Sequence, residues 1–381
     1  MSTLPASPSP LSIVEHSGTL TERLRTLHGR LLETVPGVDR IACALYDAGE
    51  DRLKTFINST RQGHAISGYE YPLAASESLS RLARSGDFRV LDEIDAVIRA
   101  DSQHSRWLLE QGYRSSFTVP IYEGGELLGF VFFDSLQPAA FTPAVQRDLV
   151  LYSGLISMSI IGELSAVRIT IDAARAMREI TEIRDFETGM HLERMGRYAE
   201  IIARAVAPRF GYSDEFAEKV YLFAPLHDVG KLGIPDRILL KPGRLDAEER
   251  AIMETHVEKG IEIIERMIGH GGFRTFPDST ILRNIVACHH EMLDGSGYPR
   301  GLSGAQVPLE ARIVSVADIF DALTSKRPYK REWTMAQAFD ELRRLVAEGK
   351  LDGACVEALI GQALAVEHVM TCYVDHEDED A

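Results

Sequence analysis

The chain of 381 residues changes character near residue 142, and this change limits its fold more than any other feature of the sequence. Before that point, short stretches rich in β-forming residues alternate with helical stretches. After it, helical patterns dominate. Because 381 residues exceed one average domain, and because the two patterns are separated along the chain, we expect two folded units.

Two hairpins are predicted in the first half. Residues 40–57, RIACALYDAGEDRLKTFI, read as two strands joined by an acidic turn that contains glycine. Residues 115–134, SSFTVPIYEGGELLGFVFFD, give two more strands around a Glu-Gly-Gly turn. A polar stretch that favours helix lies between the hairpins. The mixture predicts an α+β domain over residues 18–160, preceded by a disordered segment at 1–17.

This first half resembles a GAF sensory domain. The resemblance rests on Gly112-Tyr113-Arg114-Ser115 leading into VPIYEGGELLGFVFF, and on AFTPAVQRDLVLYSGLI. It implies a sensor whose ligand is unknown, since GAF domains bind cyclic nucleotides, tetrapyrroles, metals or nothing. We expect Cys43 to be a small core residue of a strand, and His64 and His104 to lie on the surface. A dimerisation module without a ligand stays an alternative.

A long helix is predicted from residue 142 to residue 185, with a connecting segment at 161–180. Apolar residues spaced 4, 3, 4 and 3 apart mark one stripe of this helix: Ile160, Leu164, Val167, Ile171 and Ala174. The stripe favours a parallel helix pair that forms a homodimer, although it spans only about two heptads. A helix packed on its own domain is the alternative.

Composition excludes several classes of partner. The formal net charge of −16 and the lack of a basic stripe argue against binding to DNA or RNA. No run of 18 apolar residues and no secretory signal are evident, so we expect a cytoplasmic protein without a membrane span. The four cysteines form no metal or disulfide pattern. The acidic tail at 369–381 reads as a solvated end.

Residue types that bind metals gather in the second half, which reads as helical. Five of the chain's twelve histidines lie there in mostly apolar surroundings with carboxylates near them. Burying so many polar groups would be costly without a shared cation. Imidazoles and carboxylates without thiolates favour iron, manganese or zinc, and more than four ligands imply at least two ions. Asp228 suits the role of the bridging carboxylate, because its neighbour His227 can bind one of the ions.

The stretch ACHHEMLDGSGYPRGL, residues 287–302, sets two histidines side by side before a loop rich in glycine. Adjacent side chains on a helix diverge by about 100°. His289 and His290 can therefore approach a metal cluster from two directions near a helix end. The loop that follows is expected to shape the mouth of the site.

Several motifs of this half resemble the HD-GYP family of the HD phosphohydrolase superfamily. They are HDVGK, HHEMLDGSGYP and PLEARIVSVADIFDALTSKRPYK, and the similarity spans roughly residues 175–365. The resemblance implies an all-α domain, placed here at 181–368, that hydrolyses cyclic di-GMP through two or three divalent metal ions, commonly iron or manganese. The whole chain is then multidomain: an N-terminal α+β GAF-like domain, a long connecting helix and a C-terminal all-α HD-GYP domain.

The resemblance also assigns residues. The implied metal ligands are Glu187, His191, His227, Asp228, His256, His289, His290 and Asp318. Glu187 matches the glutamate that accommodates a third ion. Lys231 matches a lysine close to the scissile phosphate and, with Asp228, forms the expected catalytic pair. Substrate contacts are expected from Gly297, Tyr298, Arg327 and Lys330. Tyr298 could instead anchor its loop beside Pro299.

The function expected from these motifs is hydrolysis of cyclic di-GMP to pGpG, and further to GMP, under control of the GAF sensor. Water activated by the metal ions would be the nucleophile, so no side-chain nucleophile is required. One alternative is another cyclic dinucleotide, such as cyclic GMP-AMP. Another is a signalling scaffold that binds the nucleotide, or a diguanylate cyclase partner, without turnover.

Overall fold

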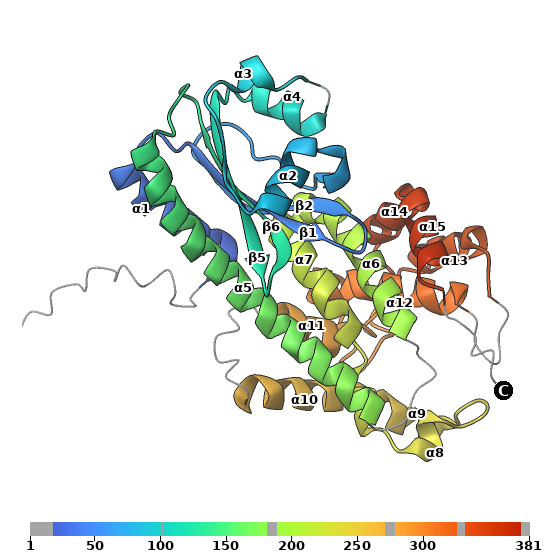
Figure 1. The fold of residues 1–381 in the computed structure, drawn as a ribbon. Helices are drawn as coiled ribbons and strands as arrows, with labels where there is room; N and C mark the ends of the chain where they lie inside the picture. Colours follow the sequence, from blue (N-terminus) through green and yellow to red (C-terminus); the bar gives the residue numbers. More distant parts are fainter. Residues whose placement is uncertain (1–17, 101, 181–188, 271–278, 326–331, 375–381) are drawn as a thin grey trace, which may run out of the picture. The chain divides into compact units, whose positions relative to one another are not determined.

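The computed structural model describes residues 18–100, 102–180, 189–270, 279–325 and 332–374. The chain divides into two compact units, Met1–Leu164 with Ser213–Glu215, and Ser165–Tyr212 with Phe216–Ala381. The predicted terminal segment 1–17 lies outside the described residues, as does most of the acidic tail. Figure 1 shows the strands and the first helices in the N-terminal unit, and the remaining described helices in the C-terminal unit.

The N-terminal unit is built on one antiparallel sheet with the strand order β3-β2-β1-β6-β5-β4. The strands are β1 Arg40–Asp47, β2 Arg52–Thr60, β3 Glu70–Pro72, β4 Arg89–Leu91, β5 Ser115–Glu123 and β6 Glu126–Ser135. Strands β1 and β2 form the first predicted hairpin, and β5 and β6 form the second. Both predicted hairpins are therefore confirmed.

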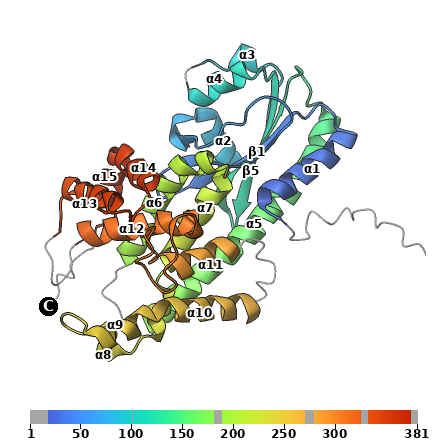
Figure 2. The same cartoon turned by 180° about the vertical axis from the view of Figure 1, so that it is seen from behind.

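Helices cover the two faces of this sheet. They are α1 Leu20–Thr34, α2 Glu77–Ser85, α3 Ile94–Val97, α4 Gln103–Glu110 and the long α5 Pro143–Ile180. Helices α1 and α5 lie on one face, where Arg23 of α1 pairs with Glu163 of α5, while α2, α3 and α4 lie on the other (Figures 1 and 2). Helix α1 begins with a capping box between Thr19 and Glu22, which satisfies its first backbone amides.

Strand alternation sends two kinds of side chain to the two faces. In the register of β1, β6 and β5, Ile41 pairs with Phe133, and Phe133 pairs with Phe117. All three are fully buried, as expected for the core face. The neighbouring positions, Arg40 opposite Asp134, alternate to the opposite face, which is unusually polar for a buried surface.

Helix α5 is confirmed where a long helix was predicted, but the described part of its apolar stripe faces inward. Ile160, Leu164 and Val167 are at most 5% exposed within this chain, so at these positions the alternative of a helix packed on its own chain is correct. The side chains of Ile171 and Ala174 lie outside the described residues. A different face of α5 is exposed and apolar, with Leu151 at 71% and Met158 at 67% exposure.

Within the part of the chain that the structure describes, one helical segment, Pro143–Ser165, is long and apolar enough to cross a membrane by length and composition alone. The bent helix pair Gly353–Gly361 and Ala363–Cys372 passes the same test as a unit. This amends the expectation that no such stretch exists. Leu149, Ile156 and Ile160 of the segment are buried, so one of its faces serves the domain core.

The described residues of the C-terminal unit form helices joined by loops. The longer helices are α6 Gly189–Val206, α7 Asp214–Phe223, α9 Ala247–Glu254, α10 His256–His270, α11 Ser279–Cys288, α12 Leu309–Thr324, α13 Met335–Ala347, α14 Gly353–Gly361 and α15 Ala363–Cys372. Short turns complete the set: η3 Ala207–Phe210, η4 Ala224–Leu226, η5 Val229–Gly233, α8 Asp236–Leu239 and η7 Gly304–Gln306.

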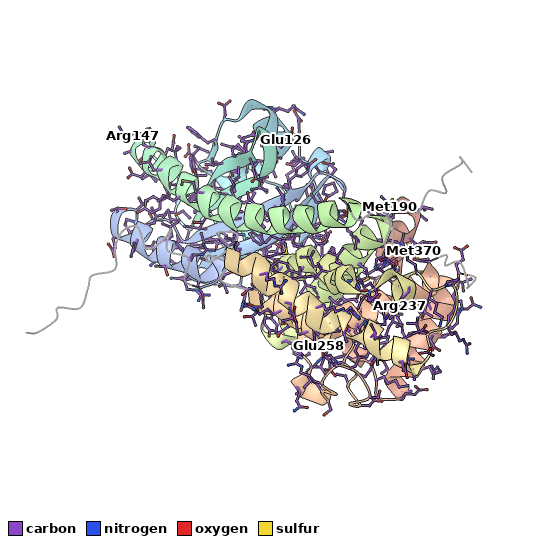
Figure 3. All side chains as sticks on the ribbon, turned by 90° about the horizontal axis from the view of Figure 1, so that it is seen from below. Glu126, Arg147, Met190, Arg237, Glu258 and Met370 are labelled. Atoms are coloured by element: carbon purple, nitrogen blue, oxygen red, sulfur yellow. The ribbon has the colours of Figure 1, made fainter. Side chains whose placement is uncertain are left out.

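Helices α6 and α12 form the centre of this unit. Tyr198 of α6 and Phe320 of α12 are fully buried, and their rings meet edge to face with centroids 5.0 Å apart. On the outside, Arg237 of α8 and Glu258 of α10 are exposed, as the side chains in Figure 3 show. The polar residues that lie inside this apolar core therefore need an explanation of their own.

Candidate metal centre

The first group of possible metal ligands consists of Asp228, His256, His289 and His290. One ligand atom from each lies within 4.8 Å of the others. Asp228 precedes η5, His256 is the first residue of α10, and the two adjacent histidines directly follow α11. Three segments that are far apart in the sequence thus meet at one point.

The second group consists of His191, His227 and Asp318, again with ligand atoms within 4.8 Å of one another. His191 lies on α6, His227 follows η4, and Asp318 lies on α12. The two central helices of the domain therefore supply this group. Together the two groups contain seven of the eight ligands expected from the sequence.

Asp228 joins the two groups. Its Oδ2 atom lies 3.2 Å from Nε2 of His227, in the second group. Its Oδ1 atom lies 3.1 Å from Nε2 of His256 and 3.5 Å from Nε2 of His289, in the first group. A carboxylate with one oxygen toward each group has the geometry of a ligand that bridges two ions.

Four of the imidazoles are oriented in the same way, through their Nδ1 atoms. His227, His256 and His289 each place Nδ1 within 3.0 Å of a backbone carbonyl oxygen, those of Ala224, Met253 and Ile285 respectively. His191 instead places Nδ1 2.7 Å from Oδ2 of Asp321. An Nδ1–H that donates to an oxygen leaves the lone pair on Nε2, which is the state of a histidine that binds a metal.

The donor atoms are buried where the two groups meet. The Nε2 atoms of His256 and His289 and the Oδ1 atom of Asp228 are inaccessible to solvent and make no hydrogen bond to another described residue, although they converge within 3.5 Å. Buried polar atoms without hydrogen bonds are rare and costly. A divalent cation between them would satisfy all three, so the residues fit a metal centre.

The charges of the site suit cations. Burial lowers the pKa of His289 and that of His290, which keeps both imidazoles neutral at neutral pH. Burial alone would raise the pKa of Asp228, but Lys231 and His227 hold it well below its usual value. The Nζ atom of Lys231 lies 2.9 Å from Oδ2 of Asp228. The expected catalytic pair is therefore in direct contact.

Gly230 allows the HDVGK turn to pack directly against the start of helix α10. A Cβ atom at this position would lie 1.8 Å from the carbonyl oxygen of His256. Only glycine lets the turn approach the first residue of α10 so closely. This contact brings the turn that carries Asp228 and Lys231 against the helix that begins with His256.

The loop after α11 is fixed by a buried carboxylate. Glu291 is 2% exposed and accepts hydrogen bonds from the backbone amides of Arg300 and Leu302, each at 2.8 Å. A Cβ atom at Gly297 would lie 2.3 Å from the backbone nitrogen of Met292, so the loop also packs tightly on itself. Glu291 thus determines the course of the loop at the mouth of the site.

Tyr298 of this loop lies over a metal-ligand candidate. Its ring stacks on that of His290, with centroids 4.6 Å apart and planes 29° apart. It also meets the ring of His256 edge to face at 6.2 Å. Tyr298 therefore packs against His256 and His290, which agrees with a role in anchoring its loop.

Some expected site residues lie outside the described part of the chain. They are Glu187, Arg327 and Lys330. Conversely, sequence reasoning missed Asp321 as an orienting group for His191. The signal was present, because Asp321 lies three residues after Asp318 on α12 and thus on a neighbouring position of the same helical face. Burial alone would raise the pKa of Asp321, but hydrogen bonds from His191 and Arg194 lower it to about 2.

Comparison with known proteins assigns the two parts of the chain to two different domain families. The GAF domain family matches residues 20–160, and the HD domain family matches residues 177–355. The C-terminal half of the chain is therefore similar to the HD domain family, and the part before it is similar to the GAF domain family. The resemblance inferred from the motifs is confirmed for both domains.

Among curated relatives, the chain is similar to 3'3'-cGAMP-specific phosphodiesterase 2 of Vibrio cholerae, with 45% identity over 42% of this chain and 29% of that protein. It is similar to the cyclic di-GMP phosphodiesterase response regulator RpfG of Xanthomonas campestris, with 44% identity over 49% of this chain and 47% of the relative. It is also similar to a cyclic di-GMP phosphodiesterase of Thermotoga maritima, with 42% identity over 53% and 50%. The chain thus spans half or less of these relatives.

Proposed function

We propose that this chain is a metal-dependent phosphodiesterase that hydrolyses cyclic di-GMP to the linear dinucleotide pGpG. The observation that carries the proposal is the position of Asp228, whose two oxygens face two separate groups of buried ligands. Such a pair of ion sites suits the opening of a phosphodiester. All seven described ligands are intact, which favours turnover over a scaffold that only binds nucleotide.

The chemistry divides between the ions and the protein. Two bound divalent ions would activate a water molecule and neutralise charge on the phosphate. Asp228 fixes the spacing of the two sites, and the Nδ1 contacts fix the direction of the imidazoles. Lys231, with Nζ 2.9 Å from Oδ2 of Asp228, is proposed to lie beside the scissile phosphate and to stabilise the negative charge that develops there. Arg327 and Lys330 are proposed as clamps on the phosphates of the substrate.

The metal is proposed to be iron or manganese, bound as two ions. The described ligands are imidazole and carboxylate without thiolate, since Cys288 directs its Sγ atom to Arg300 and belongs to neither group. A third ion would use Glu187. Counting bound ions in protein purified without oxygen distinguishes two from three.

A second candidate substrate is 3'3'-cyclic GMP-AMP. The first of the three relatives bears the name of a phosphodiesterase specific for this dinucleotide, whereas the other two are named for cyclic di-GMP. The metal centre treats the phosphodiester of either substrate alike. Which of the two dinucleotides is the preferred substrate therefore depends on contacts between the protein and the bases.

The test is hydrolysis by protein purified anaerobically and supplied with ferrous iron or manganese, with the two dinucleotides as competing substrates and bound metal counted in the same sample. We expect pGpG, with GMP as a slower second product, and loss of both in chelator. Faster turnover of cyclic GMP-AMP would reassign the substrate. No product from either dinucleotide despite two bound ions would support the scaffold alternative.

The proposal also covers how the enzyme is regulated, whether it forms a dimer, and where in the cell it acts. The GAF domain is proposed to act as the sensor of a cytoplasmic enzyme, and a diguanylate cyclase as a possible protein partner. The homodimer expected through the connecting helix is proposed to extend along the exposed face of α5 with Leu151 and Met158, since Ile160, Leu164 and Val167 of the stripe are buried. Sedimentation of the chain and of its Met158→Glu variant tests this: a monomer in both contradicts the dimer.

A further inference from the structure

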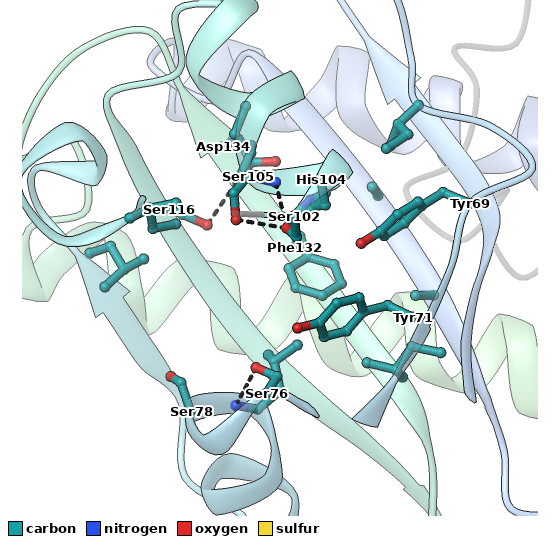
Figure 4. A pocket seen from close by; sticks show the side chains of 18 of the residues that line it. Tyr69, Tyr71, Ser76, Ser78, Ser102, His104, Ser105, Ser116, Phe132 and Asp134 are labelled. Atoms are coloured by element: carbon teal, nitrogen blue, oxygen red, sulfur yellow. Dashed lines mark hydrogen bonds between the residues drawn. The ribbon is translucent and has the colours of Figure 1, made fainter. Parts of the chain in front are cut away.

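The N-terminal domain contains a cavity of about 390 Å³ on the face of the sheet covered by α2 and α4. Arg40 of β1, Ser116 of β5 and Phe132 of β6 line it, and Figure 4 shows Ser116 and Phe132. This volume lies at the lower end of the range for pockets that enclose a small organic ligand. The cavity is independent of the metal centre and of the hydrolysis proposed for it.

Aromatic rings form one wall of the cavity. The rings of Tyr69 and His104 are near parallel, with centroids 5.9 Å apart, and Tyr71 continues the row 6.2 Å beyond Tyr69. Phe132 lies beside these rings, with its ring centroid 6.3 Å from that of His104 (Figure 4). His104 was expected on the surface, and the structure instead shows it partly buried, where it lines the cavity. Such a wall suits a flat ring system.

One carboxylate inside the cavity is already neutralised. Asp134 is 1% exposed and pairs closely with the guanidinium of Arg40. Its other oxygen accepts a hydrogen bond from the hydroxyl of Ser116 at 2.8 Å. The single negative charge of Asp134 therefore acts on two cations: Arg40, with which it forms an ion pair, and Arg89, with which it forms none.

Arg89 is that second cation. It donates to two neutral hydroxyls, Ser78 Oγ at 2.9 Å and Thr118 Oγ1 at 3.1 Å. Its Nε atom is buried without a hydrogen bond among the described residues, and none of their carboxylates forms an ion pair with it. Burial lowers the pKa of Arg89, which reflects the cost of holding this charge away from water.

We propose that this cavity binds a planar aromatic molecule that carries one anionic group. The ring lies against Tyr69 and Tyr71, and the anion pairs with Arg89, whose planar guanidinium suits a phosphate or a carboxylate. One anion suffices, because Arg40 is already paired. His104 adds no charge, since burial lowers its pKa to about 4.

Two sources share this chemistry: a nucleoside monophosphate and an aromatic carboxylic acid. Adenosine 5'-monophosphate and 4-hydroxybenzoate serve as their probes. Adenosine, which is aromatic but neutral, and ribose 5-phosphate, which is anionic but not aromatic, are the matched controls. If the proposal holds, at least one aromatic anion binds at least tenfold more tightly than both controls, and its identity selects the source.

The chain offers a local reporter for this titration. Of its two tryptophans, Trp107 lies beside the cavity, with its ring 6.1 Å from that of His104 and 4.6 Å from the guanidinium of Arg40. The variant Trp333→Phe leaves Trp107 as the one tryptophan in the full chain. Its fluorescence during titration of the metal-loaded protein then follows binding in the N-terminal domain.

Substitutions at two arginines complete the test. Arg89→Gln should weaken the aromatic anion at least tenfold, Arg89→Lys should weaken it less, and Arg84→Gln, at the exposed end of α2, should leave it unchanged. If Arg89→Gln fails to fold, the comparison of Arg89→Lys with wild type replaces it. The proposal is overturned if none of the four probes changes the fluorescence, if a control binds as tightly as the aromatic anions, or if the folded Arg89 variant retains full affinity.

Discussion

Oδ2 of Asp321 lies 2.7 Å from Nδ1 of His191, so a carboxylate that is not a member of either ligand group orients one of the candidate ligands. The same carboxylate accepts a hydrogen bond from Nε of Arg194 at 2.6 Å. Both contacts are buried. Asp321 therefore acts on the metal centre through His191.

The substitution Asp321→Asn should weaken metal binding at the group of His191, His227 and Asp318. Loss of an outer carboxylate of this kind typically reduces metal affinity about 10- to 100-fold. Retention of manganese against increasing chelator, with bound ions counted, should show one ion released early while the other stays. Asp340→Asn, an exposed change on α13, is the matched control. Release of both ions together at the wild-type chelator concentration would contradict the orienting role.

Asp228→Ala should abolish hydrolysis and remove most of the stabilisation that bound metal gives the fold. A ligand that binds only the folded state raises the unfolding temperature, and wild type should show this rise on addition of manganese. Because Asp228 faces both groups, its removal should eliminate most of the rise. Thermal unfolding with and without manganese measures it, with Asp340→Ala as control. A variant that keeps the full rise and full activity would disprove the bridging assignment.

Gly297→Ala should impair substrate use while leaving the metal in place. The added Cβ would lie 2.3 Å from the backbone nitrogen of Met292, so the loop that carries Tyr298 must shift. We expect a rise in KM of about tenfold or more, since about 1.4 kcal/mol of lost binding corresponds to a factor of ten. Steady-state kinetics and metal counting test this. Gly29→Ala on α1, an exposed position where a Cβ meets no atom within 4 Å, should change neither quantity. Equal loss of metal in the Gly297 variant would show that the loop serves the ligands instead.

The sequence was sufficient for the features that depend on local pattern. Both hairpins, the long helix α5 and the clustering of His227, Asp228 and the adjacent histidines follow from periodicity and from residue type. Asp321 and Glu291 were missed because a buried carboxylate that accepts hydrogen bonds looks like any other charged helix or loop residue in a sequence. Their partners, His191 and the amide of Arg300, become visible only when the chain is folded.

The sequence was least informative about which side chains are buried and what they pack against. The spacing of Ile160, Leu164 and Val167 gave a stripe, but the same stripe serves a dimer or an internal core, and only the packing decides. His104 was placed on the surface because an isolated histidine in a polar helix usually lies there. The row of rings beside it, from Tyr69 and Trp107, depends on contacts between distant segments.

His104 should make the stability of the protein depend on pH. Burial is the largest cause that lowers its pKa from 6.5 to about 4, Arg40 and Arg89 lower it further, and Asp134 opposes them. The unfolded chain thus binds the proton more tightly, so stability is lost as pH falls from about 6.5 to about 4, by about 1–3 kcal/mol. His104→Phe keeps a ring beside Tyr69 but cannot titrate, and should reduce this loss. Thermal unfolding at pH 7.5 and pH 5 compares the two, with the exposed His64→Gln as control. An equal loss in wild type and in His104→Phe would show that other groups cause the acid sensitivity.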